Sequence, residues 1–265
     1  MTMDLFQTII LGFIQGVTEW LPISSTGHLR IAEHLFGLTV PLIFDVTLHL
    51  GTLIVTLIFF RKEIINILTA LAKRDFKTEY GRLIPIIIVG TVPTVLIGFF
   101  FGDALDKYFS SFLALGAGFI VSGAVLYSSK FGGEKKDSAT YVDALLIGTA
   151  QGFAIFPSIS RSGITIAVAL LIGLKREKAF KFSFLLSVPA IIGALGLTFY
   201  EQRDALTVAG IGWTEIAVGV VVSIVVSFLA LKLLWRVIAS RKFHFFAIYC
   251  FSIGALLIGL SLFGF

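Results

Sequence analysis

Two short turns carry most of the side chains in this chain that could do chemistry, and both lie inside strongly apolar sequence. The first turn, residues 22–28, follows Glu19 and contains three hydroxyls and an imidazole. The second turn, residues 157–165, is centred on Arg161. A guanidinium can bind phosphate through two parallel hydrogen bonds, and an ionisable side chain in a membrane segment is costly and usually functional. These residues therefore predict a site for an anionic ligand that carries phosphate.

Four residues are predicted to be catalytic in a phosphoryl transfer. Ser25 is the predicted attacking hydroxyl, and Glu19 or His28 would remove its proton. Arg161 would neutralise charge on the transferred group. An ion pair with Glu19 is a second role for Arg161, and the two roles are compatible if Arg161 turns to phosphate when substrate binds. Direct attack by His28 is the open alternative to attack by Ser25.

The remaining polar residues of the turns are predicted to bind phosphate. Backbone N–H groups at the start of a helix bind anions, and a glycine lets a ligand approach the backbone closely. Capping of a helix explains one hydroxyl in a turn, but not the whole set. The predicted phosphate-binding residues are Ser24, Thr26, Gly27, Ser160, Ser162, Gly163 and Thr165. Asp45 and His49, four residues apart in an apolar segment, are assigned to support or lining.

The two turns belong to an internal repeat. When the chain is aligned with itself so that Gln15 meets Gln151, nine residues of the first copy meet a residue of the same type in the second. These residues are Gly12, Gln15, Gly16, Ile23, Ser24, Gly27, Leu35, Gly37 and Leu38. In each copy a polar turn joins two short apolar segments, 5–21 with 28–38 and 142–156 with 164–174. Most of these segments are too short to cross a bilayer alone, which takes about 20 apolar residues. They therefore predict two re-entrant helical hairpins, with a binding site where the hairpins meet.

The composition excludes an ordinary soluble domain, because 57% of the residues are hydrophobic, 14% are charged and the mean hydropathy is +0.98. Six further stretches are long enough to span a membrane: 41–60, 83–101, 112–128, 180–199, 212–234 and 243–262. The predicted fold is an all-α polytopic membrane protein. It has six transmembrane helices and two re-entrant hairpins in one domain, residues 1–265, with inverted repeats at about 1–130 and 140–265.

Basic residues predict the orientation of the chain. They gather in the loops 61–82, 129–141, 175–181 and 235–242, whereas 102–111 and 200–212 hold one each. Loops rich in Lys and Arg stay in the cytoplasm, and this pattern holds only if 142–174 enters and leaves on the cytoplasmic side. We therefore expect a multi-pass plasma-membrane protein with both termini outside. The net charge of +5 is an orientation signal, and no nucleic-acid partner is expected.

These motifs resemble those of the undecaprenyl-diphosphate phosphatase family, the bacitracin-resistance membrane phosphatases. The resemblance is carried by Gln15 with Glu19, by both turns, and by the segments HLGTL at 49–53 and FSFLLSVPA at 182–190. It spans nearly the whole chain. Two positions depart from the family pattern, since Gln15 stands where many members have glutamate and Ser158 replaces the usual glycine.

The resemblance implies removal of the terminal phosphate from a polyprenyl diphosphate, which yields the monophosphate carrier of cell-envelope glycan assembly. It also implies a site that opens to the extracytoplasmic side and a divalent cation, Mg²⁺ or Ca²⁺, with Glu19 and Gln15 as the predicted ligands. A lipid transporter or flippase is the alternative, because inverted repeats with broken helices are a transporter architecture. The expected partners are the lipid substrate, membrane lipids and, as an open expectation, a second copy in a homodimer.

Overall fold

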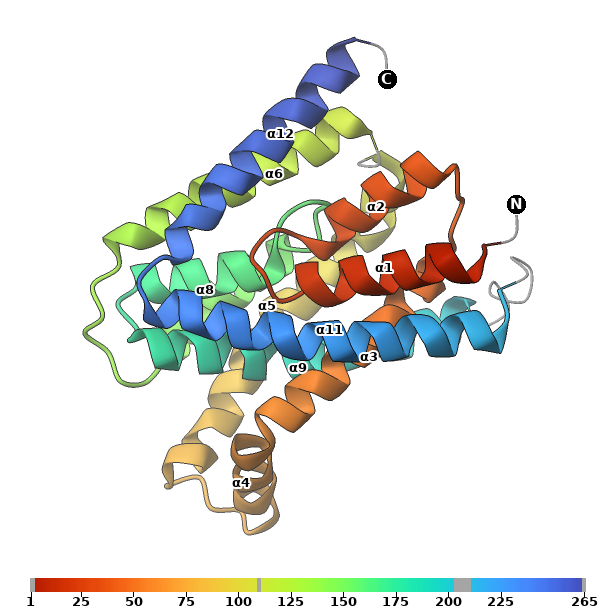
Figure 1. Ribbon diagram of the computed structural model, residues 1–265. Helices are drawn as coiled ribbons and strands as arrows, with labels where there is room; N and C mark the ends of the chain where they lie inside the picture. Colours follow the sequence, from red (N-terminus) through yellow and green to blue (C-terminus); the bar gives the residue numbers. More distant parts are fainter. Residues whose placement is uncertain (1–2, 109–110, 203–210, 264–265) are drawn as a thin grey trace.

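The computed structural model describes residues 3–108, 111–202 and 211–263, and helices make up most of this part of the chain (Figure 1). The helices of the first half are α1 (Leu5–Thr18), α2 (Ser25–Phe36), α3 (Leu42–Phe59), α4 (Arg61–Ala72), α5 (Glu79–Tyr108) and α6 (Phe112–Ser128). Those of the second half are α7 (Tyr141–Phe153), α8 (Arg161–Leu171), α9 (Arg176–Gln202), α11 (Trp213–Ala239) and α12 (Phe246–Leu262). Short 3-10 turns lie at Ser129–Phe131 and Phe243–Phe245.

Within the described residues, six helical segments are long and apolar enough to cross a membrane: Leu42–Phe59, Glu79–Gly102, Phe112–Phe131, Arg176–Gln202, Trp213–Ala239 and Phe243–Leu262. They coincide with the six predicted spans, and the differences lie at the ends, where α5, α9 and α11 extend beyond the apolar stretch. The prediction of an all-α polytopic membrane protein is confirmed. Residues 109–110 and 203–210, within the two loops poor in basic residues, lie outside the described part.

Apart from α4, the short helices of the described part form two pairs, each joined by a turn. Helices α1 and α2 have 14 and 12 residues, and α7 and α8 have 13 and 11. Each is shorter than the roughly 20 residues that a bilayer core requires. These lengths suit the predicted hairpins, whereas their re-entry into a membrane stays a prediction.

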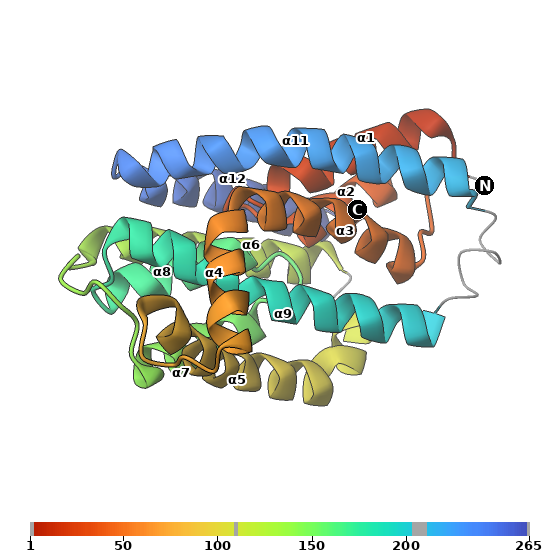
Figure 2. The same cartoon turned by 90° about the horizontal axis from the view of Figure 1, so that it is seen from below.

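The two hairpins exchange partners between the halves of the chain. Helix α1 packs along α11 of the second half, while α7 packs along α5 of the first half, and the long helices α6 and α12 pair with each other (Figures 1 and 2). Glycines allow both close crossings, with Gly12 against Gly219 and Gly148 against Gly90. A Cβ atom at Gly12 would lie 2.6 Å from the carbonyl oxygen of Gly219. The pairing of α1 with α11 is equivalent to that of α7 with α5, as expected if the two halves of the chain are related by a repeat.

An aromatic cluster lies directly behind the first turn. Trp20 is fully buried, and its ring centroid lies 5.0 Å from that of Phe184 on α9. Phe60 and Phe180 extend this cluster. Burying a large side chain of this kind contributes about 1.5–3 kcal/mol, so the cluster fixes the backbone next to Glu19 against α3 and α9.

The basic segment 61–82, expected from the sequence to be a loop, begins with helix α4. Ile64, Ile67 and Ala70 recur every three residues and face the protein, with Ala70 buried. A helix forms here because that spacing gives one apolar face, even though the segment is too charged to span a membrane. In Figure 1, α4 extends away from the bundle and α5 returns to it.

Candidate active site

The site is built where two helices begin. Helix α2 begins at Ser25 and α8 at Arg161, and these two residues are equivalent in the internal repeat. Each helix is capped by the preceding serine: Ser24 Oγ accepts from the N–H of Gly27 at 3.4 Å, and Ser160 Oγ accepts from that of Gly163 at 3.1 Å. The start of a helix carries a partial positive charge, so both ends favour an anion between them.

Small residues let the two turns touch. A Cβ atom at Gly27 would lie 2.6 Å from Ser158 Oγ, and a Cβ atom at Gly163 would lie 3.2 Å from Pro22 Cβ. These two contacts are equivalent in the repeat, since Pro22 and Ser158 occupy the same relative position. Ser158 has a φ of +63°, in the left-handed region that favours glycine. The glycine that the family resemblance implies at this position would adopt this backbone without strain.

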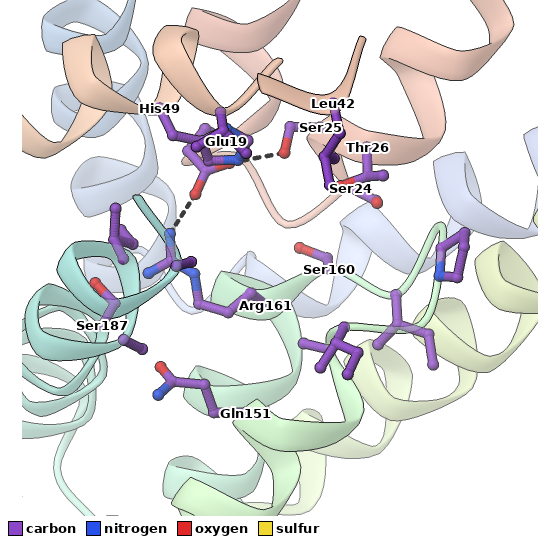
Figure 3. A pocket seen from close by; sticks show the side chains of 18 of the residues that line it. Glu19, Ser24, Ser25, Thr26, Leu42, His49, Gln151, Ser160, Arg161 and Ser187 are labelled. Atoms are coloured by element: carbon purple, nitrogen blue, oxygen red, sulfur yellow. Dashed lines mark hydrogen bonds and ion pairs between the residues drawn. The ribbon is translucent and has the colours of Figure 1, made fainter. Parts of the chain in front are cut away.

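Glu19 is the centre of the polar contacts (Figure 3). Its Oε1 atom accepts from Arg161 in an ion pair. Its Oε2 atom accepts from Ser25 Oγ at 2.7 Å and from Gln15 Nε2 at 3.2 Å, and lies 3.3 Å from His49 Nε2. The residue is only 7% exposed. A serine hydroxyl within hydrogen-bond reach of a carboxylate has the geometry of a nucleophile and its base.

His49 reaches this carboxylate from α3 and was not predicted as a catalytic or binding residue. Its Nδ1 atom lies 2.8 Å from the backbone oxygen of Asp45, one helical turn earlier. The i,i+4 spacing of Asp45 and His49 is the available signal, but it does not say which face of the helix meets Glu19. His49 lines the cavity described below, as assigned, but that assignment did not include its contact with Glu19.

A cavity of about 720 Å³ opens next to Glu19 and Arg161. Ser24, Ser25, Thr26 and Ser160 line its polar end, while their roles at a phosphate stay predictions. Further along, the wall is apolar and includes Leu42, Val46, Ala190, Ile191 and Ala194. A polar end beside an apolar wall suits an amphiphile with a charged head.

A second amide, for which no role was predicted, lies in the same cavity. Gln151, the repeat equivalent of Gln15, donates from Nε2 to Thr94 Oγ1 at 3.2 Å. Gln151 and Thr94 both line the cavity. Figure 3 shows Gln151 on the far side of Arg161 from Glu19. The presence of glutamine at both equivalent positions, 15 and 151, could have drawn attention to Gln151, although it does not predict what the residue does.

The other predicted residues lie around the site and do not line the cavity. His28 Nδ1 lies 2.7 Å from the backbone oxygen of Ser24, and its Nε2 lies 2.7 Å from the hydroxyl of Tyr249 on α12. Ser162 Oγ donates to the backbone oxygen of Trp20 at 3.2 Å. Thr165, Gly27 and Gly163 hold the two helix starts: the threonine hydroxyl donates to the Arg161 oxygen at 2.8 Å, and the glycines form the turn contacts.

The residues around Glu19 do not fit a divalent cation held by the protein alone. The two oxygens of Glu19 already have four side-chain neighbours, which is as many as a carboxylate has lone-pair sites. Gln15 Oε1 is buried without a hydrogen-bond partner, but it is a single neutral oxygen. Within the described residues, no group of three or more His, Cys, Asp or Glu side chains is placed to hold a metal.

Fold and site together define a polytopic helical membrane protein with a buried anion site at the end of a cavity suited to an amphiphile. The chain belongs to the bacitracin resistance protein BacA family, whose family model matches residues 8–256. It is 43% identical to the undecaprenyl-diphosphatase of Carboxydothermus hydrogenoformans over 98% of both chains. It is 40% identical to undecaprenyl-diphosphatase 3 of Bacillus cereus over 98% of both. It is 36% identical to the undecaprenyl-diphosphatase of Korarchaeum cryptofilum, over 97% of this chain and 100% of that one. The family resemblance predicted from the motifs is confirmed.

Proposed function

We propose that this chain is a membrane phosphatase that hydrolyses undecaprenyl diphosphate to the monophosphate and inorganic phosphate, which recycles the lipid carrier for envelope glycan synthesis. The observation that carries the proposal is the 2.7 Å contact between Ser25 Oγ and Glu19, with Arg161 on the other oxygen of the same carboxylate. Relatives at 36–43% identity over nearly the full length bear the name undecaprenyl-diphosphatase. The apolar cavity wall suits a prenyl tail.

In the first step Ser25 Oγ attacks the terminal phosphorus, and Glu19 Oε2 accepts the hydroxyl proton. The bond between that phosphorus and the bridging oxygen breaks, so the lipid leaves as its monophosphate. Arg161 and the N–H groups at the starts of α2 and α8 stabilise the charge on the transferred phosphoryl group. Pre-positioned donors of this kind contribute about 10²–10³-fold each to a rate.

In the second step water removes the phosphoryl group from Ser25. Glu19 first releases the proton that it accepted from Ser25, and this proton reaches the solvent through the cavity. It then accepts a proton from the attacking water and passes it to Ser25 Oγ as the phosphorus–Oγ bond breaks. The products are inorganic phosphate and the original hydroxyl, and the overall reaction releases one proton.

Two alternatives find less support in the contacts. Direct attack by His28 requires its Nε2 to give up the contact with the Tyr249 hydroxyl, because Nδ1 is held on the backbone oxygen of Ser24. A lipid transporter needs anion recognition but has no use for a hydroxyl held on a carboxylate. The pairing of Ser25 with Glu19 therefore favours catalysis by Ser25 over both.

A divalent cation, Mg²⁺ or Ca²⁺, is proposed to arrive with the diphosphate. Mg²⁺ is usually bound through one or two carboxylates together with substrate phosphates, and it keeps several waters. The absence of a complete ligand set among the described residues fits that arrangement. Glu19 and Gln15 stay the predicted protein ligands, and the chemistry that the cation supplies is neutralisation of the diphosphate charge.

The site is proposed to open to the extracytoplasmic side, with both termini outside. Gly102, Thr198 and Gln202 line the cavity, and they lie next to the two loops poor in basic residues. The basic loops 61–82 and 175–181 adjoin the opposite, N-terminal ends of α5 and α9. A homodimer stays a prediction, which light scattering on the detergent-purified protein would check.

Phosphate release from undecaprenyl diphosphate tests the proposed function. Purified protein is compared with Glu19→Gln and Arg161→Ala, with and without Mg²⁺ or Ca²⁺, and melting temperatures check that the variants are folded. Release that depends on the cation and is lost in both variants supports the phosphatase. Well-folded protein that binds the lipid but releases no phosphate would overturn it in favour of transport.

A further inference from the structure

The side-chain amide of Gln151 is fixed in one orientation. Its Nε2 atom lies 3.2 Å from Thr94 Oγ1, and that hydroxyl donates to the backbone oxygen of Gly148 at 2.9 Å. A hydroxyl has a single hydrogen, so Thr94 can only accept from Gln151, and the nitrogen of the amide must face it. The direction of the amide oxygen is therefore set by α5 and by α7, the helix that carries Gln151.

The oxygen of the same amide is left over. Gln151 is only 3% exposed, and its Oε1 atom is buried without a hydrogen-bond partner among the described residues. A buried acceptor without a partner costs about 1–3 kcal/mol, and each such group in a folded protein requires an explanation. Because Gln151 lines the cavity, the missing donor is a group that can enter the cavity or move within it.

Arg161 is the side chain that fits this acceptor. Its guanidinium lies between Glu19 and Gln151 (Figure 3), and the contact with Glu19 is made through Nη2. A guanidinium has five N–H donors and no acceptor, so it can bond to Oε1 of Gln151 while other donors face a ligand. A fully ionised phosphate, by contrast, has no hydrogen to donate to Oε1.

The internal repeat shows why an amide on this side differs from a carboxylate. In the first copy Gln15 is followed four residues later by Glu19, whereas in the second copy Gln151 is followed by Ile155, which also lines the cavity. The second copy therefore presents a neutral oxygen to Arg161. A neutral acceptor orients a guanidinium without cancelling its charge, so the charge stays available to phosphate.

We propose that Gln151 is a positioning residue for Arg161, whose guanidinium donates to Gln151 Oε1 when it turns from Glu19 to the phosphate of the substrate. The proposal rests on the proposed phosphatase function and deepens it. With one N–H group on Gln151, the remaining donors face the phosphate in a fixed direction, where two parallel hydrogen bonds can form. Without Gln151 the contact with Glu19 would be favoured, and phosphate would bind more weakly.

Binding of an analogue that cannot be hydrolysed tests this role apart from catalysis. The probe is undecaprenyl diphosphate with a methylene group in place of the bridging oxygen, and its Kd is measured with detergent-purified protein. Gln151→Met has a side chain of similar length without a polar oxygen, and we expect Kd to rise about 10-fold. Melting temperatures check that each variant is folded.

Two threonines of α5 provide a matched pair of variants. Thr94→Val removes the hydroxyl that fixes the amide of Gln151, and we expect Kd to rise about 3-fold. Thr91→Val is the control, because Thr91 Oγ1 donates to the backbone oxygen of Ile87 at 2.8 Å and the residue lines a separate apolar groove. We expect Kd to be unchanged in this variant.

A double-mutant cycle shows whether Gln151 acts through Arg161. If it does, Gln151→Met should raise Kd about 10-fold in the unmodified protein and less than about 2-fold in an Arg161→Ala background. A glutamine with a merely structural role would cost the same in both backgrounds. Equal effects in the two backgrounds, or an unchanged Kd in Gln151→Met alone, would overturn the proposal.

Phosphate release separates this proposal from the proposed function. On undecaprenyl diphosphate we expect Gln151→Met to raise KM and to lower kcat, because Arg161 contacts both the bound substrate and the transferred group. If the unmodified protein binds the analogue but releases no phosphate from the substrate, the phosphatase function fails, and the cycle of Kd values still decides the role of Gln151. Failure of the unmodified protein to bind the analogue would overturn both.

Discussion

Ser24 and Ser25 are adjacent hydroxyls with different positions at the site. Ser24 caps α2, whereas Ser25 donates to Glu19. Ser25→Ala should therefore lower kcat by about 10³-fold or more, because it removes the proposed nucleophile. Ser24→Ala should cost about 0.5–2 kcal/mol of stability as a lost cap and lower kcat less than Ser25→Ala does, because the proposed nucleophile is kept.

Trapping the phosphorylated enzyme identifies the nucleophile directly. Undecaprenyl diphosphate labelled in its terminal phosphate is mixed with the protein, the reaction is quenched with acid or base, and the labelled peptide is mapped. The expected label is on Ser25. A label on His28, or full turnover by Ser25→Ala, would refute the serine mechanism.

Gln15 bears on the response to divalent cations. Its Nε2 atom lies 3.2 Å from Glu19 Oε2, so Gln15→Glu would place a second carboxylate beside the first. Two carboxylates together with substrate phosphates are a typical Mg²⁺ environment. We expect the Mg²⁺ concentration for half-maximal phosphate release to fall about 3–10-fold in this variant. Gln15→Met, of similar length and without a ligand oxygen, is the control, and an unchanged Mg²⁺ response in Gln15→Glu would contradict the placement of the cation near Glu19.

Some of the site residues could be predicted from the sequence, and others could not. Glu19, Ser25 and Arg161 could, because an ionisable group or a hydroxyl cluster in apolar sequence is unusual enough to indicate function by itself. His49 could not, since a histidine in a span has no defined partner until α3 is placed against the first turn. The ring of His28 turns to Tyr249, which is 221 residues away, and no local pattern encodes that contact.

At the scale of elements, the contact between the two turns sets the distance between the starts of α2 and α8. Gly27→Ala places a methyl group against Ser158 Oγ and against the ring of Phe119, whose nearest atom is 2.7 Å from the added carbon. Overpacking of this kind costs about 1–3 kcal/mol. We expect a lower melting temperature and a loss of activity larger than the loss of stability, because the turns must separate.

Gly98→Ala is the control for that substitution. Gly98 lies within α5, and an added Cβ atom there meets nothing within 4 Å. Alanine also has the higher helix propensity, so the melting temperature should rise slightly or stay unchanged. Equal effects of the two substitutions would mean that the turns can separate without consequence for the site.

The elements themselves were largely predictable, because a bilayer demands long apolar helices and the hydropathy of the chain marks them. Two features were not. Helix α4 lies in a charged segment, where its apolar spacing is a weaker signal than the charge. The exchange of partners, with α1 on α11 and α7 on α5, depends on glycine contacts such as Gly12 with Gly219. Contacts between distant helices leave no mark on the local pattern of either helix.

At the scale of the whole molecule, the cavity and the charged loops lie toward opposite ends. The cavity extends to Gly102 and Gln202, at the ends of α5 and α9. The other end of α9 carries Lys178 and Lys181, which pair with Glu79 and Glu63. Since basic loops are retained in the cytoplasm, a substrate would enter from the extracytoplasmic side.

Single cysteines can test this orientation, because Cys250 is the only native cysteine and it is buried. In a Cys250→Ser background, Thr39→Cys lies between α2 and α3, and Ser240→Cys follows α11; both positions are exposed. A membrane-impermeant maleimide applied to intact cells should label position 39 strongly. Position 240 should react only after the membrane is permeabilised.

The same approach tests the second hairpin. Ser138→Cys precedes α7 and Lys175→Cys follows α8, and both positions are exposed. If α7 and α8 enter and leave on the cytoplasmic side, neither position reacts in intact cells and both react after permeabilisation. Labelling of one position alone from outside would mean that residues 142–174 cross the membrane once. The basic residues after α8 would then lie outside, and the two halves would no longer be inverted. Activity of each variant shows that the labelled protein is the folded one.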